Sequence, residues 1–98
     1  LMAKFSYQPF KLGIVVTTKS IQDRVASDPV LAADIRNRLA HHRAGQYGDV
    51  DVESRLQNDE ATHTKADILS VYKCRGVVYW IKTDAGHGVT TIMLPSDM

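Results

Sequence analysis

The amino-acid sequence predicts an α+β fold, a two-layer domain with helices packed on a small antiparallel sheet. Three observations support this prediction. A β-branched run occupies residues 11–18, helical spacing of apolar residues follows it, and strand-like runs at 67–74, 77–83 and 89–94 complete the chain. Helices that precede an antiparallel meander are typical of this class. The expected order of elements is β-α-α-α-β-β-β.

Two helices are expected after the first strand. Ser20, with Asp23 three residues later, predicts the N-terminal cap of a short helix. Asp28-Pro29 predicts the start of a longer helix, because proline is favoured at the first helical position after an acidic cap. The apolar residues of this helix recur every four positions and are expected to be buried: Leu31, Ile35 and Leu39. Gly45 supplies its C-terminal stop.

A third, polar helix is predicted to begin near Asp49 or Asp51. Its inner face would carry, by spacing, Val52, Leu56 and His63, with Asp59 on the same stripe. Asn58 lies off that stripe, so its side chain is expected to reach the preceding loop or solvent. Farther along, Arg75-Gly76 predicts the turn of a hairpin. Pro95 ends the last strand, because proline has no amide hydrogen for the ladder.

Composition limits the possible classes of function. The 98 residues suit one domain over 1–98, of which residues 1–10 are expected to form a flexible N-terminal segment. The 12 basic and 11 acidic residues give a net charge of +1, a smaller basic excess than nucleic-acid-binding proteins usually carry. Cys74 is the single cysteine, which excludes an intramolecular disulfide and favours a reducing cytoplasm. No apolar run reaches membrane-spanning length, so no membrane partner is expected.

The segment His42–Asp49 is the most informative part of the sequence. Gly45 and Gly48 allow a positive φ or a close approach of the backbone to another surface. We therefore expect an ordered loop that presents His42 and Tyr47. His42 lies on the apolar face of the second helix near its end. It is either a half-buried histidine favoured by the helix dipole or an acid–base group that works near neutral pH.

Four residues could be imagined around a metal ion: His41, His42, His63 and Asp49. Adjacent histidines project from different sides of a helix, however, so His41 is expected to point toward solvent. The chain also has no His-x-x-x-His pair. We therefore expect neither a metal site nor a cofactor.

A set of short motifs spans nearly the whole chain: Leu12-Gly-Ile-Val-Val-Thr-Thr18, His42, Gly45, Gly48, Asp49, Asn58, Ile68-Leu69-Ser70, Tyr72, Trp80, Thr83, Thr90-Thr91 and Leu94-Pro95. In these motifs the chain resembles a family of small proteins encoded on plasmids and other mobile elements, some labelled as restriction-enzyme subunits. It departs from the family pattern at Gln46, where an Asp is usual, at Tyr47, where a Trp is usual, and at His87, where an Arg is usual. The resemblance implies a mobile-element accessory protein and carries no activity with it.

Two functions remain open at this stage. The first is binding of a host or element-encoded macromolecule, with a protein as the expected partner, by the following residues: Gly45, Gln46, Tyr47, Gly48, Asp49, Asn58, Ser70 and Tyr72. Nucleic acid and a second copy of the chain, paired through the sheet face, are further partners to test. The alternative is a metal-independent ribonuclease-like toxin with His42 and His87 as its acid–base pair, by analogy with barnase-like and RelE-like layouts. Lys82 or Arg75 would then hold phosphate. The missing basic excess ranks this alternative second.

Overall fold

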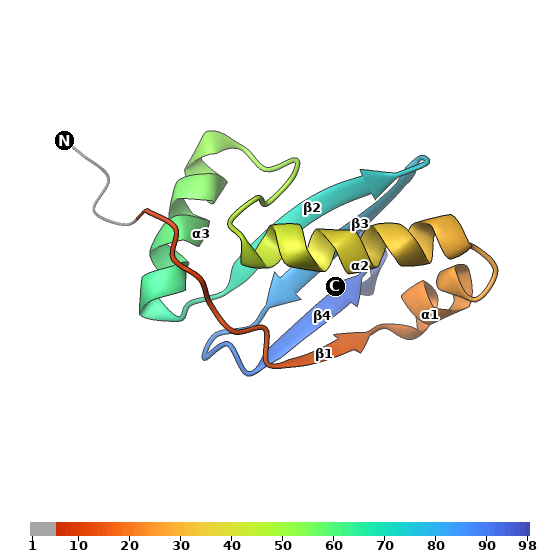
Figure 1. Ribbon diagram of the computed structural model, residues 1–98, viewed down its shortest axis with the longest axis horizontal. Helices are drawn as coiled ribbons and strands as arrows, with labels where there is room; N and C mark the ends of the chain where they lie inside the picture. The colour runs from red at the N-terminus through yellow and green to blue at the C-terminus, as the bar shows by residue number, and fades with distance from the viewer. Residues whose placement is uncertain (1–5) are drawn as a thin grey trace.

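The computed structural model describes residues 6–98 and confirms the α+β class and the order of the elements (Figure 1). The strands and helices are β1 (Ile14–Thr17), α1 (Lys19–Val25), α2 (Pro29–Arg43), α3 (Val52–Thr64), β2 (Ile68–Cys74), β3 (Val77–Thr83) and β4 (Val89–Met93). A short 3-10 helix at Pro95–Asp97 follows the last strand. Within the described residues, no helix is long and apolar enough to cross a membrane.

The four strands form one sheet in the order β1-β4-β3-β2. Strands β2, β3 and β4 make the expected antiparallel meander, with Tyr72 opposite Tyr79 and Ile81 opposite Ile92. The sheet as a whole is mixed, because β1 pairs in parallel with β4. Three helices separate β1 from β2 along the chain. After them the chain enters the meander at β2, on the opposite edge of the sheet, and the last strand, β4, lies beside β1 and runs in the same direction.

Helices α1 and α2 cover one face of the sheet, and α2 lies across its front in Figure 1. The main core lies between these helices and the sheet, and its buried members are Ile21, Leu31, Ile35, Tyr72, Tyr79, Ile81 and Ile92. The predicted bounds of α2 are confirmed, because the Asp28 carboxylate accepts a hydrogen bond from Leu31 N and Gly45 follows the helix with a φ of 77°. Leu39, predicted to be buried, is only half-buried at the border of this core.

Two sequence predictions about the other helices are wrong. Thr18, and not Ser20, caps α1, because the Thr18 side chain accepts from Ile21 N while the Ser20 hydroxyl donates to Asp97. On α3, capped by Asp51, one of the two starts that the sequence left open, the three residues predicted on the inner face are exposed: Val52, Leu56 and His63. The buried side chains of α3 are Asn58, Ala61 and Thr62.

The unexpected face of α3 has a physical reason. This helix stands beside the β2 edge rather than over the sheet (Figure 1). The backbone groups of that edge have no neighbouring strand, so the helix faces them with a polar side chain that forms hydrogen bonds rather than with an apolar stripe. A second, smaller cluster fills the space between α3, the N-terminal segment and the sheet, and its buried members are Phe10, Tyr47, Ala61 and Ile68.

The segment before β1 makes specific contacts. Residues 1–5 of the segment expected to be flexible lie outside the described residues. Of the remainder, Phe10 is 6% exposed, and Gln8 donates hydrogen bonds from its backbone and side chain to the hydroxyl and the carbonyl of Thr62. The chain is thereby attached to α3 before it enters β1.

The loop between α2 and α3 adds a short backbone pairing to the β2 edge. Val71 N donates to Tyr47 O at 3.0 Å, and Asp49 N donates to Val71 O at 2.7 Å. Gly48 lies between these two bonds in a parallel bridge with Val71. Its φ is 74°, and Gly45 also has a positive φ, as the sequence predicted. An added Cβ at position 48 would lie 2.1 Å from Val71 O, which only glycine avoids.

We predict that Gly48→Ala lowers the free energy of unfolding by about 3 kcal/mol or more, through backbone strain plus overlap with Val71 O. Gly86→Ala is the matched control, because Gly86 has a φ of 88° but nothing within 4 Å of an added Cβ. It should lose only about 1 kcal/mol, the strain alone. Urea denaturation of both variants measures the difference, and equal losses would contradict the close approach at position 48.

Candidate functional site

His42 is fully buried between α2 and the sheet, with a solvent-exposed fraction of 0%. Its Nδ1 lies 2.5 Å from Ser70 Oγ on β2, and its Nε2 lies 2.9 Å from Thr83 Oγ1 on β3. Both hydroxyl groups are themselves fully buried. The spacing that placed His42 on the inner face of α2 therefore predicted its direction correctly, although the burial is complete rather than partial.

The hydrogen bonds continue from β3 to the segment before β1. Thr83 Oγ1 and Thr90 Oγ1 are 2.7 Å apart, and Thr90 Oγ1 donates to the carbonyl of Leu12 at 2.7 Å. A hydroxyl has one hydrogen, so Thr90 must accept from Thr83, and Thr83 must then accept from His42 Nε2. His42 is thus the neutral tautomer with hydrogen on Nε2, and its Nδ1 accepts from Ser70. We call this set the buried polar chain: Ser70, His42, Thr83, Thr90 and the Leu12 carbonyl.

Burial also controls the charge of this histidine. It lowers the pKa of His42 from 6.5 to about 4, and the neighbouring His87 adds to the shift. The Phe10 ring packs edge-on against His42 at 5.4 Å between centroids and lies 5.4 Å from the ring of His87. His87 is 7% exposed, and its Nε2 donates to the carbonyl of Ala66 at 3.0 Å. At neutral pH His42 is uncharged, and both of its nitrogens are engaged within the protein.

Three of the residues singled out from the sequence, His42, Ser70 and His87, come together in the interior rather than around a cleft. His42 bonds to Ser70, and the ring of Phe10 lies between His42 and His87. Tyr47 belongs to the same small cluster as Phe10. His41 is half-buried, not directed to solvent as predicted, and within the described residues its buried Nδ1 has no hydrogen-bond partner.

Sequence reasoning missed Phe10, Thr83 and Thr90 as members of this arrangement. Phe10 lies in a segment without a periodic pattern, so no local signal marked it. The two threonines share a sheet face with the buried Ile81 and Ile92, and that alternation was the one available signal for their burial.

Two tyrosines fix the loop between α2 and α3. Tyr47 is 2% exposed and donates its hydroxyl hydrogen to Asp59 on α3 at 2.9 Å; this burial and the carboxylate raise the pKa of the phenol. Tyr72 on β2 donates to the carbonyl of Gln46, and the Arg38 guanidinium lies 5.1 Å from the centre of the Tyr72 ring. The loop is thereby held at two consecutive residues, through the carbonyl of Gln46 and the side chain of Tyr47, and Gln46 as a whole is exposed.

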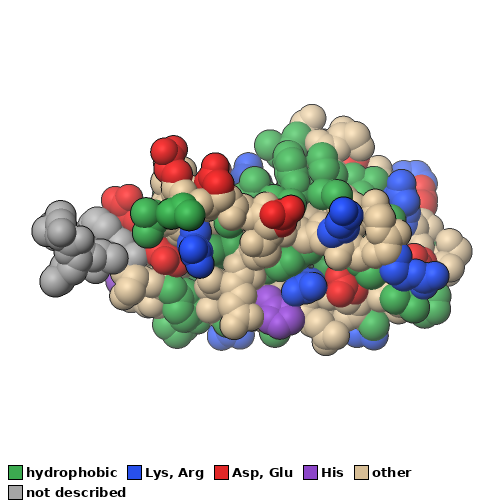
Figure 2. Space-filling view, turned by 90° about the horizontal axis from the view of Figure 1, so that it is seen from above, with side chains coloured by type: hydrophobic (Ala, Val, Ile, Leu, Met, Phe, Trp, Pro, Cys, Tyr) green, Lys and Arg blue, Asp and Glu red, His purple; other side chains and the backbone are tan. Residues whose placement is uncertain are grey.

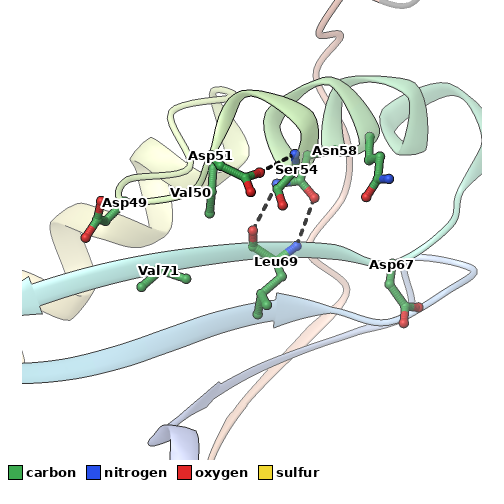
Figure 3. Close-up of a pocket in the computed structure, with 9 residues that line it drawn as sticks. Asp49, Val50, Asp51, Ser54, Asn58, Asp67, Leu69 and Val71 are labelled. Carbon is green, nitrogen blue, oxygen red and sulfur yellow. Dashed lines mark hydrogen bonds between the residues drawn. The ribbon is translucent and has the colours of Figure 1, made fainter.

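Pockets lie on both sides of this loop. One, of about 420 Å³, is lined by Arg38, Gly45, Gln46, Tyr47, Gly48, Val50 and Arg55. The other, of about 440 Å³, is lined by Asp49, Val50, Asp51, Ser54, Gln57, Asn58, Asp67, Leu69 and Val71 (Figure 3). The first therefore carries two arginines and the second three aspartates. In residues 6–98, no three His, Cys, Asp or Glu side chains are grouped so that they could hold a metal ion.

Asn58 forms one wall of the second pocket and joins α3 to β2. Its side-chain amide donates to Leu69 O at 2.9 Å, and its side-chain oxygen accepts from Leu69 N at 3.2 Å. Figure 3 shows the two bonds side by side. The residue is 6% exposed, so the prediction that it faces the loop or solvent is wrong. The Asn58 side chain thus forms, with the N–H and C=O groups of Leu69, the two hydrogen bonds that a neighbouring strand would otherwise form.

The sheet face opposite α1 and α2 carries mostly apolar side chains. Strand pairing places Lys73, Lys82, Val89 and the buried Met93 on it together with seven residues that we call the open sheet face: Ile14, Val16, Leu69, Val71, Val78, Trp80 and Thr91. The exposed fractions of Ile14, Val16 and Val78 are 68%, 41% and 38%, and the other four residues are half-buried. In the view from above, apolar side chains gather on one long side of the molecule (Figure 2).

The basic residues of this face do not form a cluster. Lys73 lies opposite Val78 at one end of the hairpin, and Lys82 lies opposite Leu69 at the other end. The Lys82 ammonium lies 3.7 Å from the carboxylates of both Asp67 and Asp84. A phosphate group would therefore not meet two free cations side by side here.

Comparison of the chain with protein-family models, with curated proteins and with solved structures gave no match. An inference about its function therefore depends on the geometry of its own residues. Those residues supply a buried polar chain, a fixed loop with a pocket on each side, and an open apolar sheet face.

We predict that the free energy of unfolding falls as the pH drops from about 6.5 to about 4. The unfolded chain binds a proton on His42 near its ordinary pKa of 6.5, whereas the folded chain resists it until about pH 4, so acid favours the unfolded state. The loss across this window amounts to roughly 3 kcal/mol. Urea denaturation at several pH values measures it, and His42→Gln should have a smaller slope in the same window. Equal slopes for the two proteins would exclude His42 as the source.

We also predict that Asn58→Asp and Asn58→Ala both destabilise the fold, by about 1–3 kcal/mol. The aspartate keeps an acceptor for Leu69 N but places a carboxylate against Leu69 O, whereas alanine loses both bonds. Gln57→Ala is the matched control on an exposed neighbouring position. Chemical denaturation measures the three changes, and an Asn58→Ala loss no greater than that of the control would contradict the role of this side chain.

Proposed function

We propose that this domain acts by binding a protein partner through its open sheet face. The observation that carries the proposal is the exposure of Ile14, Val16 and Val78 on the sheet face opposite α1 and α2. Apolar side chains gain free energy when association removes them from water. Exposed apolar side chains on one face of a sheet are typical of sites that meet another protein.

The composition of the face fits a protein surface better than a nucleic acid. Trp80 lies half-buried among the apolar residues of the face and offers the large aromatic surface that dominates many protein interfaces. Lys73 lies opposite Val78, and Lys82 lies between Leu69 and Thr91, where it is paired with Asp67 and Asp84, so the two lysines form no track for a backbone. A nucleic acid needs a row of cations for its phosphates, and a chain with 12 basic and 11 acidic residues has little basic excess to supply one.

The ribonuclease alternative gains no support from the geometry. A general acid or base must come within hydrogen-bond reach of the substrate. Both nitrogens of His42 are occupied inside the core, and His87 is also buried, with its Nε2 bound to a carbonyl. The arrangement supports a structural role for both histidines. On the family resemblance, we propose further that the partner is a host or element-encoded protein.

The test uses a photo-crosslinking amino acid at Val78, on the open sheet face, and at Leu56, which is also apolar and is even more exposed but lies on α3. In cells that naturally contain the protein, the probe at position 78 should capture one defined partner, and the probe at position 56 should not. Val78→Lys should weaken the binding of that purified partner at least tenfold, whereas Leu56→Lys should leave it unchanged. Equal effects of the two substitutions would contradict binding by this face.

A parallel assay tests the alternative. Purified protein should leave RNA intact, because the two histidines lack access to a phosphodiester. If RNA is cleaved, and cleavage disappears in folded His42→Ala or His87→Ala, the proposal fails and the ribonuclease function replaces it.

A further inference from the structure

The two edges of the sheet differ in how they are protected. At the β2 edge, Tyr47–Asp49 pairs with Val71, and the Asn58 side chain occupies both backbone groups of Leu69. The other edge is β1, which forms the lower border of the sheet in Figure 1. No described residue pairs with the outer side of β1. Strand β1 is thus an unpaired edge, whereas the β2 edge is protected both by the loop at Tyr47–Asp49 and by the Asn58 side chain.

The register of β1 identifies which backbone groups are free. Ile14 N donates to Gly88 O at 2.9 Å, and Thr18 N donates to Ile92 O at 3.1 Å. In a parallel pair, alternate residues of a strand bond to the same neighbour. The residues between them, Val15 and Thr17, therefore direct their N–H and C=O groups away from β4. These four groups lie along the outer edge and are symmetric about Val16.

The side chains of this edge lack the usual protection against pairing. Ile14, Val15 and Val16 are exposed by 68%, 42% and 41%, which is unusual for three successive β-branched apolar residues. Edge strands that remain unpaired normally carry lysine, proline or a bulge. None of these occurs within Ile14–Thr17.

We propose that β1 pairs in antiparallel fashion with β1 of a second copy of this chain, about a two-fold axis at Val16. In that register Val15 of each copy exchanges two hydrogen bonds with Thr17 of the other, so all four free groups of both strands are used. The two Val16 side chains meet on the open sheet face. A second copy fits because its own Val15 and Thr17 present the same outward N–H and C=O groups, at equal distances on either side of Val16.

The direction of the helix layers and the charges beside β1 agree with this register. A two-fold axis perpendicular to the sheet keeps both helix layers on one side and joins the two open sheet faces into one surface of eight strands. Just beyond the paired residues, Lys19 of one copy comes opposite Gly13 of the other, so no like charges are opposed. The inference stands apart from the proposed function, because it concerns the purified chain alone.

The first experiment measures the mass of the purified protein in solution by sedimentation over a wide range of concentration. The wild type should form a dimer. Val15→Pro removes an outward N–H without touching a bond to β4, and Val15→Lys places a charge at the edge; both should be monomeric while circular dichroism shows an intact fold. Val78→Lys, the control on the open sheet face, should remain dimeric. A wild type that is monomeric throughout would overturn the proposal, as would dimers that persist in both Val15 variants.

A second experiment gives a positive signal for the register. In a Cys74→Ser background, Val16→Cys should form an intermolecular disulfide on mild oxidation, because residues directly opposite in a non-hydrogen-bonded antiparallel pair bring their side chains close. Val78→Cys in the same background should not. Cross-linking at position 78 but not at position 16 would mean that the copies meet face to face, and it would overturn edge pairing while leaving the open sheet face as the binding surface.

Discussion

The buried polar chain is the constraint on which the rest of the structure depends. Through His42 it joins α2 to β2 and β3, and through Thr90 it reaches the segment that leads into β1. Each member has one hydrogen to give, so the direction of every bond follows from the carbonyl at its end. A fully satisfied buried network specifies one arrangement of the elements that it connects, because any shift leaves a polar atom unpaired in the core.

Local signals in the sequence predicted the elements well and their arrangement only in part. Asp28-Pro29 and Arg75-Gly76 act within a few residues, and both appear where they were expected. The parallel pairing of β1 with β4 and the position of α3 at an edge depend on contacts between distant segments. For that reason spacing assigned Val52 and Leu56 to the wrong side of α3: the helix buries small and polar groups, and its apolar side chains face water.

The candidate site shows the same division. The helical spacing put His42 on the inner face, and two glycines predicted a fixed loop, because each inference needs only the local backbone. The hydrogen-bond partners of His42 could not be predicted from local sequence patterns, since Thr83 lies 41 residues away along the chain. The chemistry of a histidine is determined by such partners and by burial. Here they make it a neutral structural group rather than one that exchanges protons with solvent.

Asn58 has a consequence for the motion of the protein. The amide hydrogen of Leu69 is held by a side chain of α3 rather than by another strand. Its exchange with solvent deuterium therefore depends on whether α3 remains against the sheet, and not on the opening of the strand ladder alone. That single amide can thus report the local detachment of one helix while the core between α2 and the sheet stays closed.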